Sequence, residues 1–277
     1  MSRFNNKVVV ITGGAKGQGR SHALAFAREG ASVVICDIAR QVPCASPMGT
    51  PQDLAETKSM IEQHGAKCLA VQADTRSGEE MRGLVETAVE AFGRVDVFVA
   101  NAGIAAFGPV KTMDYDVWRD VVDINLTGVA TSIRAVLPAM VGQGQGRIVA
   151  TASAVGREGG PNNANYTAAK WGVIGFVKSV AIEVAPHGVT VNAISPMSVA
   201  TDMCHNEATY RLFRPDLAEP SADDVRSTFA GLNPMGVPWL DVADSSAAVL
   251  FLCSDEARYV TGVALDVGAG WNAYHVA

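Results

Sequence analysis

Residues 7–20 read KVVVITGGAKGQGR, and this stretch decides the fold. The β-branched run Lys7–Thr12 leads directly into a glycine-rich turn, and a segment with helical spacing, Arg20–Glu29, follows. Glycine lets a backbone turn sharply and approach a phosphate closely, while the start of the next helix offers unpaired N–H groups and a partial positive charge. A glycine-rich turn alone is weak support for nucleotide binding, but its position between a strand and a helix strengthens that interpretation. The candidate phosphate contacts are Gly13, Lys16, Gly17, Gln18 and Gly19.

The alternation of strand and helix continues along the chain. Short, almost continuously apolar runs recur between helix-length segments, as expected for strands buried on both faces under helices. These runs are Lys7–Thr12, Ser32–Asp37, Cys68–Ala73, Val95–Ala100, Arg147–Thr151, Thr190–Ile194 and Val263–Val267. No internal repeat or linker divides the chain. The sequence predicts a single α/β domain over residues 1–277, a Rossmann-like, doubly wound parallel sheet with helices on both faces.

The composition excludes several classes of protein. Of the 277 residues, 48% are hydrophobic and 18% are charged, which rules out a largely disordered chain. The net charge is −6 and no basic run occurs, so we expect neither a nucleic-acid partner nor a membrane surface as a partner. The longest wholly apolar stretch, Ala247–Cys253, is far shorter than the roughly 20 residues that span a bilayer.

The cysteine and histidine patterns indicate a reducing compartment and no metal. The five cysteines are odd in number and never form a CxxC pair, and the five histidines form no HExxH or HxH pair. Free thiols are typical of proteins in a reducing compartment. We therefore expect a cytoplasmic protein without a metal site.

Two segments interrupt the alternation. The first, Ile38–Gln52, is long for a strand-to-helix connection, which usually takes about 2–6 residues. It leads into TPQD (residues 50–53), where threonine can cap a helix, proline suits the first helical position and aspartate complements the helix dipole. The second, residues 197–238, follows a strand at the edge where doubly wound sheets bind ligands. We interpret it as a mobile lid over the substrate; an ordinary surface excursion is the alternative.

Polar residues at the strand ends add to the nucleotide site. Asp37 follows the glycines by about 20 residues, where a carboxylate can accept hydrogen bonds from adenosine ribose hydroxyls and repel a 2′-phosphate. This favours NAD over NADP, although Asp37 taken alone could equally be a solvated loop residue. Asp74, followed by Thr75, ends the third strand and is placed to meet the adenine. Asn101-Ala102-Gly103 ends the fourth strand at the same edge.

A possible acid–base group lies further along the chain. Tyr166 and Lys170 are spaced i and i+4 on an expected helix and therefore share a face. A tyrosine with a pKa near 10 is a poor catalyst at neutral pH, but a cation one turn away favours the phenolate and lowers that pKa. Ser153 ends the fifth strand, where its hydroxyl could hold a substrate oxygen beside the tyrosine. YxxxK alone is more often an exposed helical pair, so this interpretation depends on the other motifs.

Together these motifs resemble the short-chain dehydrogenase/reductase family over nearly the whole chain. The family's TGxxxGxG is Thr12–Gly19, its NAG is Asn101–Gly103 and its YxxxK is Tyr166–Lys170. The resemblance implies an NAD cofactor and a catalytic tetrad. The implied tetrad is Asn125, Ser153, Tyr166 and Lys170, and the implied nicotinamide contacts are Pro196, Val199 and Thr201.

The family resemblance also carries a departure and an expected assembly. The family usually has glycine after the proline that ends the sixth strand, whereas this chain has Met197, which could narrow or re-aim the nicotinamide pocket. Members of the family are usually tetrameric, which implies a homotetramer with interfaces at the helices around Val117–Met140 and Tyr166–Val184.

A narrower resemblance concerns the long loop. GQGRSHA (residues 17–23) and the segment ending in Thr50–Thr57 are similar to the mycofactocin-associated, carveol dehydrogenase-like subfamily. In that subfamily the insertion folds over an NAD that does not exchange, and the cofactor is reoxidised in place through the mycofactocin system. The resemblance therefore implies that Ile38–Gln52 covers the cofactor and that the protein has a redox partner; a loop without that role is the alternative.

The expected reaction is reversible hydride transfer between a secondary alcohol and a nicotinamide. Tyr166 would take the hydroxyl proton, Ser153 would fix the substrate oxygen, and Lys170 would tune Tyr166 and bind the nicotinamide ribose. Apolar residues of the later loops suit a hydrophobic, cyclic terpenoid-like alcohol. Their candidates are Met197, Met203 and Trp239, with Phe107, Cys204, Phe213 and Met235 beside them. The alternatives are an ordinary dehydrogenase with exchanging NAD and a non-catalytic nucleotide sensor.

Overall fold

The computed structural model describes residues 2–42, 44 and 46–274. Within them, seven strands form one sheet in the order β3-β2-β1-β4-β5-β6-β7, and each neighbouring pair is parallel. The strands are β1 (Val8–Thr12), β2 (Ser32–Asp37), β3 (Cys68–Gln72), β4 (Val97–Ala100), β5 (Gly146–Thr151), β6 (Val189–Pro196) and β7 (Ala264–Val267). The predicted doubly wound parallel sheet is confirmed, and all seven predicted runs contain a strand.

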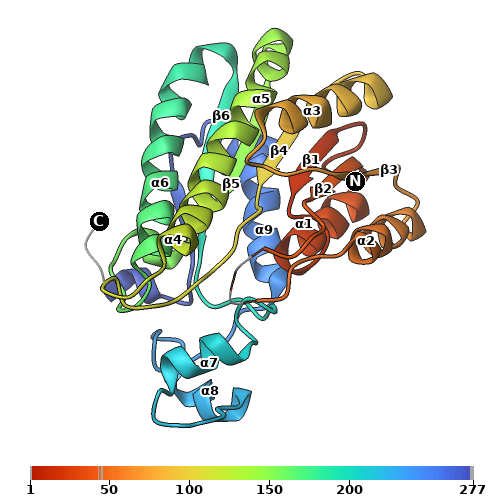
Figure 1. Ribbon diagram of the computed structural model, residues 1–277. Helices are drawn as coiled ribbons and strands as arrows, with labels where there is room; N and C mark the ends of the chain where they lie inside the picture. Colours follow the sequence, from red (N-terminus) through yellow and green to blue (C-terminus); the bar gives the residue numbers. More distant parts are fainter. Residues whose placement is uncertain (1, 43, 45, 275–277) are drawn as a thin grey trace.

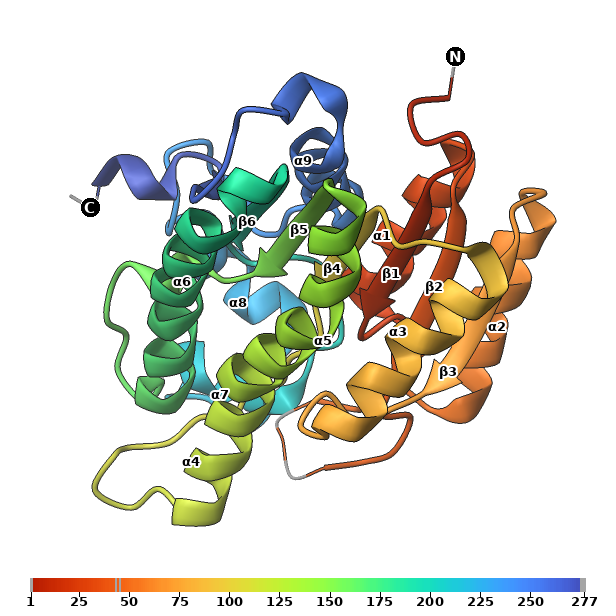
Figure 2. The same ribbon diagram turned by 90° about the horizontal axis from the view of Figure 1, so that it is seen from above.

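Helices cover both faces of this sheet (Figures 1 and 2). They are α1 (Gly17–Arg28), α2 (Pro51–Gln63), α3 (Gly78–Phe92), α4 (Tyr115–Val122), α5 (Gly128–Gln143), α6 (Ala164–Val184), α7 (Glu207–Phe213), α8 (Ala222–Ala230) and α9 (Val242–Cys253). One apolar cluster joins the sheet to α3, α5 and α6, through residues such as Met81, Ile133 and Val177. A second joins the opposite face to α1, α2 and α9, through residues such as Phe26 and Ile61. Burial on both faces explains why the strands are almost continuously apolar.

The strand order places a binding edge beside β1. The chain runs outward through β2 and β3 on one side of β1, and then crosses back to β4 on the other side. Loops leaving the carboxyl ends of β1 and β4 therefore diverge and leave a crevice, which is where doubly wound sheets bind ligands. Figure 1 shows α7 and α8 projecting beyond this edge.

The two segments that interrupt the alternation have defined structures. Thr50 caps α2, since its hydroxyl accepts a hydrogen bond from the Asp53 N–H and the Asp53 carboxylate accepts one from the Thr50 N–H. The helix therefore starts at Pro51 with Thr50 as its cap, as the residues TPQD predicted, and the last two residues of the segment Ile38–Gln52 belong to α2. The segment 197–238 contains α7 and α8, which its scattered apolar residues did not reveal.

One helical run is long and apolar enough, by length and composition, to cross a membrane. It comprises the 29 residues Tyr115–Gln143, including α4, α5 and the π-turn between them. Its inner face is occupied, since Val129, Ile133 and Val136 are buried in the cluster under the sheet. The core helix of a soluble protein passes the same test of length and hydropathy, and we interpret this run as a core helix.

Candidate active site

The glycine-rich turn brings the ends of β1 and β4 together. Gly13 has φ of +68°, and a Cβ there would lie 2.9 Å from the Ala102 Cα, so only glycine fits without strain. A Cβ on Gly19 would overlap the Gly13 carbonyl oxygen. The Thr12 hydroxyl accepts hydrogen bonds from the Asn101 and Ala102 N–H groups, at 3.0 and 3.1 Å. These contacts fix the turn against β4 and leave the first N–H groups of α1 facing the crevice.

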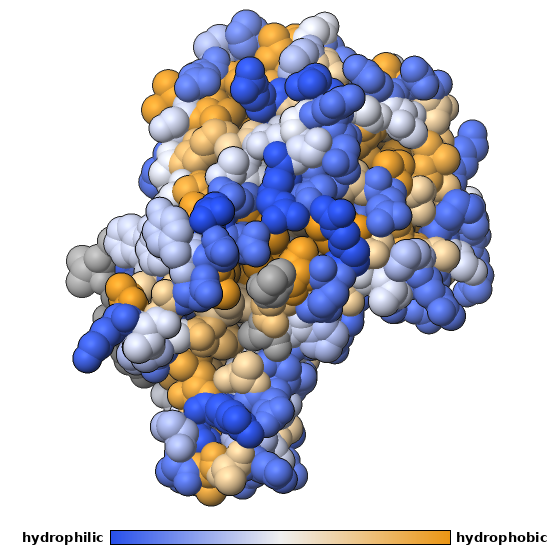
Figure 3. Space-filling view, viewed as in Figure 1, coloured by the Kyte–Doolittle hydropathy of each residue, from blue (hydrophilic) through white to orange (hydrophobic). Residues whose placement is uncertain are grey.

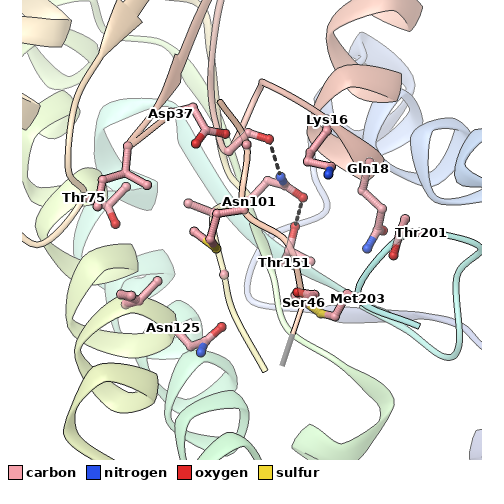
Figure 4. A pocket seen from close by; sticks show the side chains of 18 of the residues that line it. Lys16, Gln18, Asp37, Ser46, Thr75, Asn101, Asn125, Thr151, Thr201 and Met203 are labelled. Atoms are coloured by element: carbon pink, nitrogen blue, oxygen red, sulfur yellow. Dashed lines mark hydrogen bonds between the residues drawn. The ribbon is translucent and has the colours of Figure 1, made fainter. Parts of the chain in front are cut away.

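A cavity begins at this turn and runs along the carboxyl edge of the sheet (Figure 4). Most of the predicted cofactor contacts line it. These are Gly13, Lys16, Gly17, Gln18, Asp37, Asp74, Thr75, Asn101, Ala102, Gly103, Tyr166, Lys170 and Thr201, and Asn125 lies among them. Gly19 instead packs inside the turn, while Pro196 and Val199 line a second, adjoining cavity.

Asp37 and Asp74 occupy different environments at one end of this cavity. The Asp37 carboxylate accepts hydrogen bonds from the N–H groups of Ala15 and Ala39, at 3.2 and 3.0 Å. Burial raises the pKa of Asp37, and these bonds offset only part of that effect. Burial would also raise the pKa of Asp74, but hydrogen bonds from Arg76 outweigh it and lower that pKa. Asp74 is thus held in ion pairs with Arg76 and Arg40.

The residues that line the cavity fit an NAD molecule in their chemistry. The glycine turn, which a Cβ would fill, and the N-terminus of α1 suit a pyrophosphate. Asp37 suits the adenosine ribose at one end, and Lys170 lies at the other. Gln18 lines both cavities, and its buried Oε1 has no hydrogen-bond partner within the described chain. An unpaired buried acceptor at the boundary between the two cavities is suited to a bound donor such as a carboxamide.

Tyr166, Lys170 and Ser153 come together where the two cavities meet. Tyr166 and Lys170 lie one turn apart on α6, with the Lys170 Nζ 5.4 Å from the centre of the Tyr166 ring. Burial lowers the pKa of Lys170 to about 7, and its ammonium group donates a 2.7 Å hydrogen bond to the Thr151 carbonyl. Burial also raises the pKa of Tyr166 to about 12, against the lowering effect of its hydrogen bond with the Ser153 side chain. The three residues form the geometry expected of an acid–base site.

Asn125 is held rigidly in a π-turn, Asp123–Thr127, which links α4 to α5. Its side-chain amide donates to the carbonyls of Ile104 and Val121, and its Oδ1 accepts from the Ile104 N–H. A Cβ on Gly103 would lie 2.6 Å from that Oδ1 and 3.7 Å from the Lys170 Nζ. The π-turn, a feature often found at functional sites, therefore ties Asn125 to the NAG motif and brings it near Lys170.

The second cavity opens on the other side of Ser153 and Tyr166. Its volume is about 1540 Å³ including the solvent at its mouth, and Figure 3 shows hydrophobic side chains between the body and the α7–α8 projection. The sequence-predicted residues that line it are Phe107, Met197, Met203, Cys204 and Phe213. Leu212, Phe229 and Trp271 also line it, and only their apolar character could have marked them in the sequence.

Two predicted pocket residues lie elsewhere. Trp239 is not among the lining residues; its ring packs on Phe229 at 5.6 Å and on His205 at 4.7 Å between ring centres. Trp239 therefore supports the wall from behind. Met235 is 72% exposed and is also absent from the lining.

The loop after β2 lines one side of the cofactor cavity. We call residues 38–42, 44 and 46–50 the covering segment. Ser46, Pro47, Met48 and Gly49 line the cavity. Val42, only 7% exposed, packs in an apolar cluster with Ile104, Val121 and Ile124, from the opposite side of the crevice. Cys44, Met48 and Tyr166 pack against the same cluster. The covering segment thus reaches from β2 across the cavity to α4.

Comparisons with known proteins agree with this geometry. A family profile described as short chain dehydrogenase matches residues 7–211. The chain is 42% identical over 276 residues to (−)-trans-carveol dehydrogenase of Rhodococcus erythropolis, a match that covers 98% of this chain and 99% of that protein.

Solved structures give the same result. The crystal structure of carveol dehydrogenase from Mycobacterium avium in complex with NAD has a TM-score of 0.96 at 44% identity, covering 98% of this chain and 99% of that one. Levodione reductase has a TM-score of 0.87 at 31% identity, covering 99% and 100%. The site, the cofactor cavity and these relatives lead to one conclusion: the chain belongs to the short-chain dehydrogenase/reductase family and is an NAD-dependent alcohol dehydrogenase/ketone reductase.

Proposed function

We propose that this enzyme interconverts a small, hydrophobic, cyclic secondary alcohol of terpenoid-like class and its ketone. The observation that carries the proposal is the largely apolar cavity beside Ser153 and Tyr166, lined by residues such as Phe213 and Met203. The named substrates of the relatives, carveol and levodione, belong to the same size class.

The roles of the four tetrad residues follow from their positions. In oxidation, Tyr166 accepts the proton of the substrate hydroxyl. Ser153 holds the substrate oxygen that loses this proton. Lys170 favours the phenolate of Tyr166 and would bind the nicotinamide ribose, and Asn125 lines the same cavity near Lys170. NAD, when bound, supplies the hydride acceptor. A positioned proton acceptor contributes roughly 10²–10⁴-fold to the rate.

A panel of alcohols tests the substrate class. Carveol buries roughly four more methylene equivalents than propan-2-ol, and at about 0.8 kcal/mol each this gives about 3 kcal/mol, or a preference of at least about 100-fold in kcat/KM. Residues 197–238 open to admit such a substrate in this proposal. Equal kcat/KM values for carveol and propan-2-ol would remove the basis for a hydrophobic substrate.

The covering segment makes the bound NAD slow to exchange in our proposal. The support is the closure of the cavity by Met48 and Gly49 and the anchoring of Val42 across the crevice. Val42→Ala removes about two methylene equivalents from the anchor, or about 1.6 kcal/mol, which should speed NADH release about 15-fold. Val110→Ala is the control, since that side chain is 68% exposed. If both variants release NADH at the wild-type rate, Val42 does not hold the cover.

Retained NAD requires an external redox partner, of the mycofactocin type in this proposal, to take two electrons after each oxidation. An artificial acceptor such as dichlorophenolindophenol should then sustain turnover without added NAD. Steady turnover with added NAD alone would instead support the alternative, an ordinary dehydrogenase whose cofactor exchanges freely.

The proposed setting is a homotetramer in the cytoplasm. Free cysteines support a reducing compartment, and α6 presents Ile182 (78% exposed) and Trp171 (48% exposed) on the face expected to meet another subunit. Light scattering on the purified protein should give the mass of four chains, and Ile182→Lys should reduce it. A monomer mass for the wild type would contradict the assembly.

A further inference from the structure

The carbonyl of Ala15, inside the glycine-rich turn, is the meeting point of three hydrogen bonds. Arg20 donates to it from Nε and Nη2, at 3.0 and 2.8 Å. The Thr57 hydroxyl donates the third, also at 2.8 Å. Ala15 belongs to the phosphate turn, whereas Thr57 lies on α2, the helix that follows the covering segment. The Thr57 bond therefore joins two parts of the chain that the covering segment separates, while the two Arg20 bonds hold the start of α1 to the turn.

Arg20 extends this junction along α2. Its guanidinium also donates to the Thr57 hydroxyl at 2.8 Å and to the Asp53 carbonyl at 3.2 Å, and it forms an ion pair with Glu56 at 2.8 Å. Thr57 is fully buried, so its hydroxyl has no access to water as a substitute partner. A planar fork of donors suits this convergence of acceptors, and a lysine ammonium does not reproduce it.

The junction lies directly beside the end of the covering segment. A Cβ on Gly49 would lie 2.7 Å from the Ala15 Cβ and 3.3 Å from the Asp37 Oδ1, so Gly49 already packs closely on the turn. Gly49 lines the cofactor cavity, and the next residue, Thr50, caps α2. Movement of α2 away from Ala15 would therefore carry Gly49 away from the cavity.

We propose that Arg20 and Thr57 are positioning residues that fasten the covering segment to the phosphate turn and slow the release of NAD. The proposal rests on the covering role given to the covering segment under the proposed function. Arg20 and Thr57 would then control the rate at which the cofactor is released, together with the apolar anchor at Val42.

Two substitutions test the proposal through the rate of NADH release. Thr57→Val keeps the shape of the side chain and removes its hydroxyl, and Arg20→Lys keeps the charge and removes the fork. Release is measured by displacing bound NADH with excess NAD and following the loss of nicotinamide fluorescence. Each variant should release NADH about five- to tenfold faster, as expected when a net hydrogen bond of about 1–1.4 kcal/mol is lost.

Three controls separate fastening from general loss of stability. Thr87→Val removes an equivalent hydroxyl, which donates to the Gly83 carbonyl on α3, away from the cavity. Glu56→Gln removes only the exposed partner of Arg20. Thr87→Val and Glu56→Gln should release NADH at the wild-type rate. Thr57→Ser, which keeps a hydroxyl at this position, should release NADH at close to the wild-type rate.

The outcomes distinguish this inference from the proposed function. Faster release from Thr57→Val and Arg20→Lys supports the fastening role even if the wild type exchanges NAD readily. Ready exchange in the wild type would overturn only the proposal that NAD is retained. Release within twofold of the wild type in both variants, or equal acceleration in Thr87→Val, overturns the fastening role. If Thr57→Val does not fold, Arg20→Lys tests the proposal on its own. The Arg20 side chain is 22% exposed and lies at the edge of the core, so the variant should fold.

Discussion

Replacing Lys170 by methionine should raise the pKa of the catalytic tyrosine and slow alcohol oxidation in a pH-dependent way. The Lys170 Nζ lies 5.4 Å from the centre of the Tyr166 ring. At an effective dielectric constant of about 20, an ammonium at that separation stabilises the phenolate by about 3 kcal/mol. This free energy corresponds to about 2 pKa units, so the oxidation rate at a fixed pH below the tyrosine pKa should fall about 100-fold.

The attraction between Lys170 and Tyr166 is mutual. Burial alone lowers the pKa of Lys170 to about 7, and the phenolate raises it by the same amount that the ammonium lowers the pKa of Tyr166. The ammonium–phenolate pair is therefore the charge state that the attraction stabilises, although burial disfavours each charge on its own. Methionine fits the buried site without charge, so Lys170→Met removes the attraction while filling most of the volume.

The assay is single-turnover oxidation of an alcohol at saturating substrate, from pH 6 to pH 10. Oxidation requires deprotonated Tyr166, so the rate should rise tenfold per pH unit below the tyrosine pKa, and Lys170→Met should displace this profile upward by about 2 pH units. Lys178→Met is the matched control, since Lys178 is exposed two turns later on α6. A loss below about fivefold with an undisplaced profile would refute the electrostatic role of Lys170.

Three further predictions address other groups. Tyr166→Phe should lower single-turnover oxidation by roughly 10²–10⁴-fold while the protein still carries NAD; near wild-type oxidation would rule out Tyr166 as the proton acceptor. Asp37→Ser removes a buried carboxylate and should shift the NAD/NADP ratio of kcat/KM towards NADP by at least about tenfold, and an unchanged ratio would show that Asp37 does not select the cofactor. Burial lowers the pKa of His22 to about 3, so stability should fall as the pH drops from 6.5 towards 3, by about 2 kcal/mol at pH 5. Urea titrations should find this slope lost in His22→Gln, and persistence of the slope would assign it to other groups.

The sheet and the catalytic residues were predictable because their signals are local. A strand, a glycine turn and a helix occupy only residues 7–29, and Tyr166 and Lys170 share a helical face through their spacing alone. The order of the motifs along a parallel sheet then brings them to one edge, since every strand contributes its carboxyl end there. The structure accordingly places the whole predicted tetrad around the junction of the two cavities.

The contacts of the loops could not be predicted, because they depend on pairs of residues far apart in the chain. Nothing local in Val42 indicates that it packs on Ile104 and Ile124 across the crevice. Trp239 was predicted to line the substrate pocket as an apolar residue of the later loops, whereas it packs on Phe229 of α8, which lines the cavity. The ion pair of Lys16 with Asp202 likewise joins the phosphate turn to the segment after β6, which only the fold brings near.

The most direct test of this account is the absorbance spectrum of exhaustively dialysed protein before and after carveol is added without NAD. We expect the band of reduced nicotinamide to appear, with close to one equivalent per chain, because we propose that the site retains its cofactor and oxidises a hydrophobic secondary alcohol. The absence of that band, with oxidation restored only by added NAD, would contradict retention by the covering segment. No reduction under either condition would contradict the proposed substrate class.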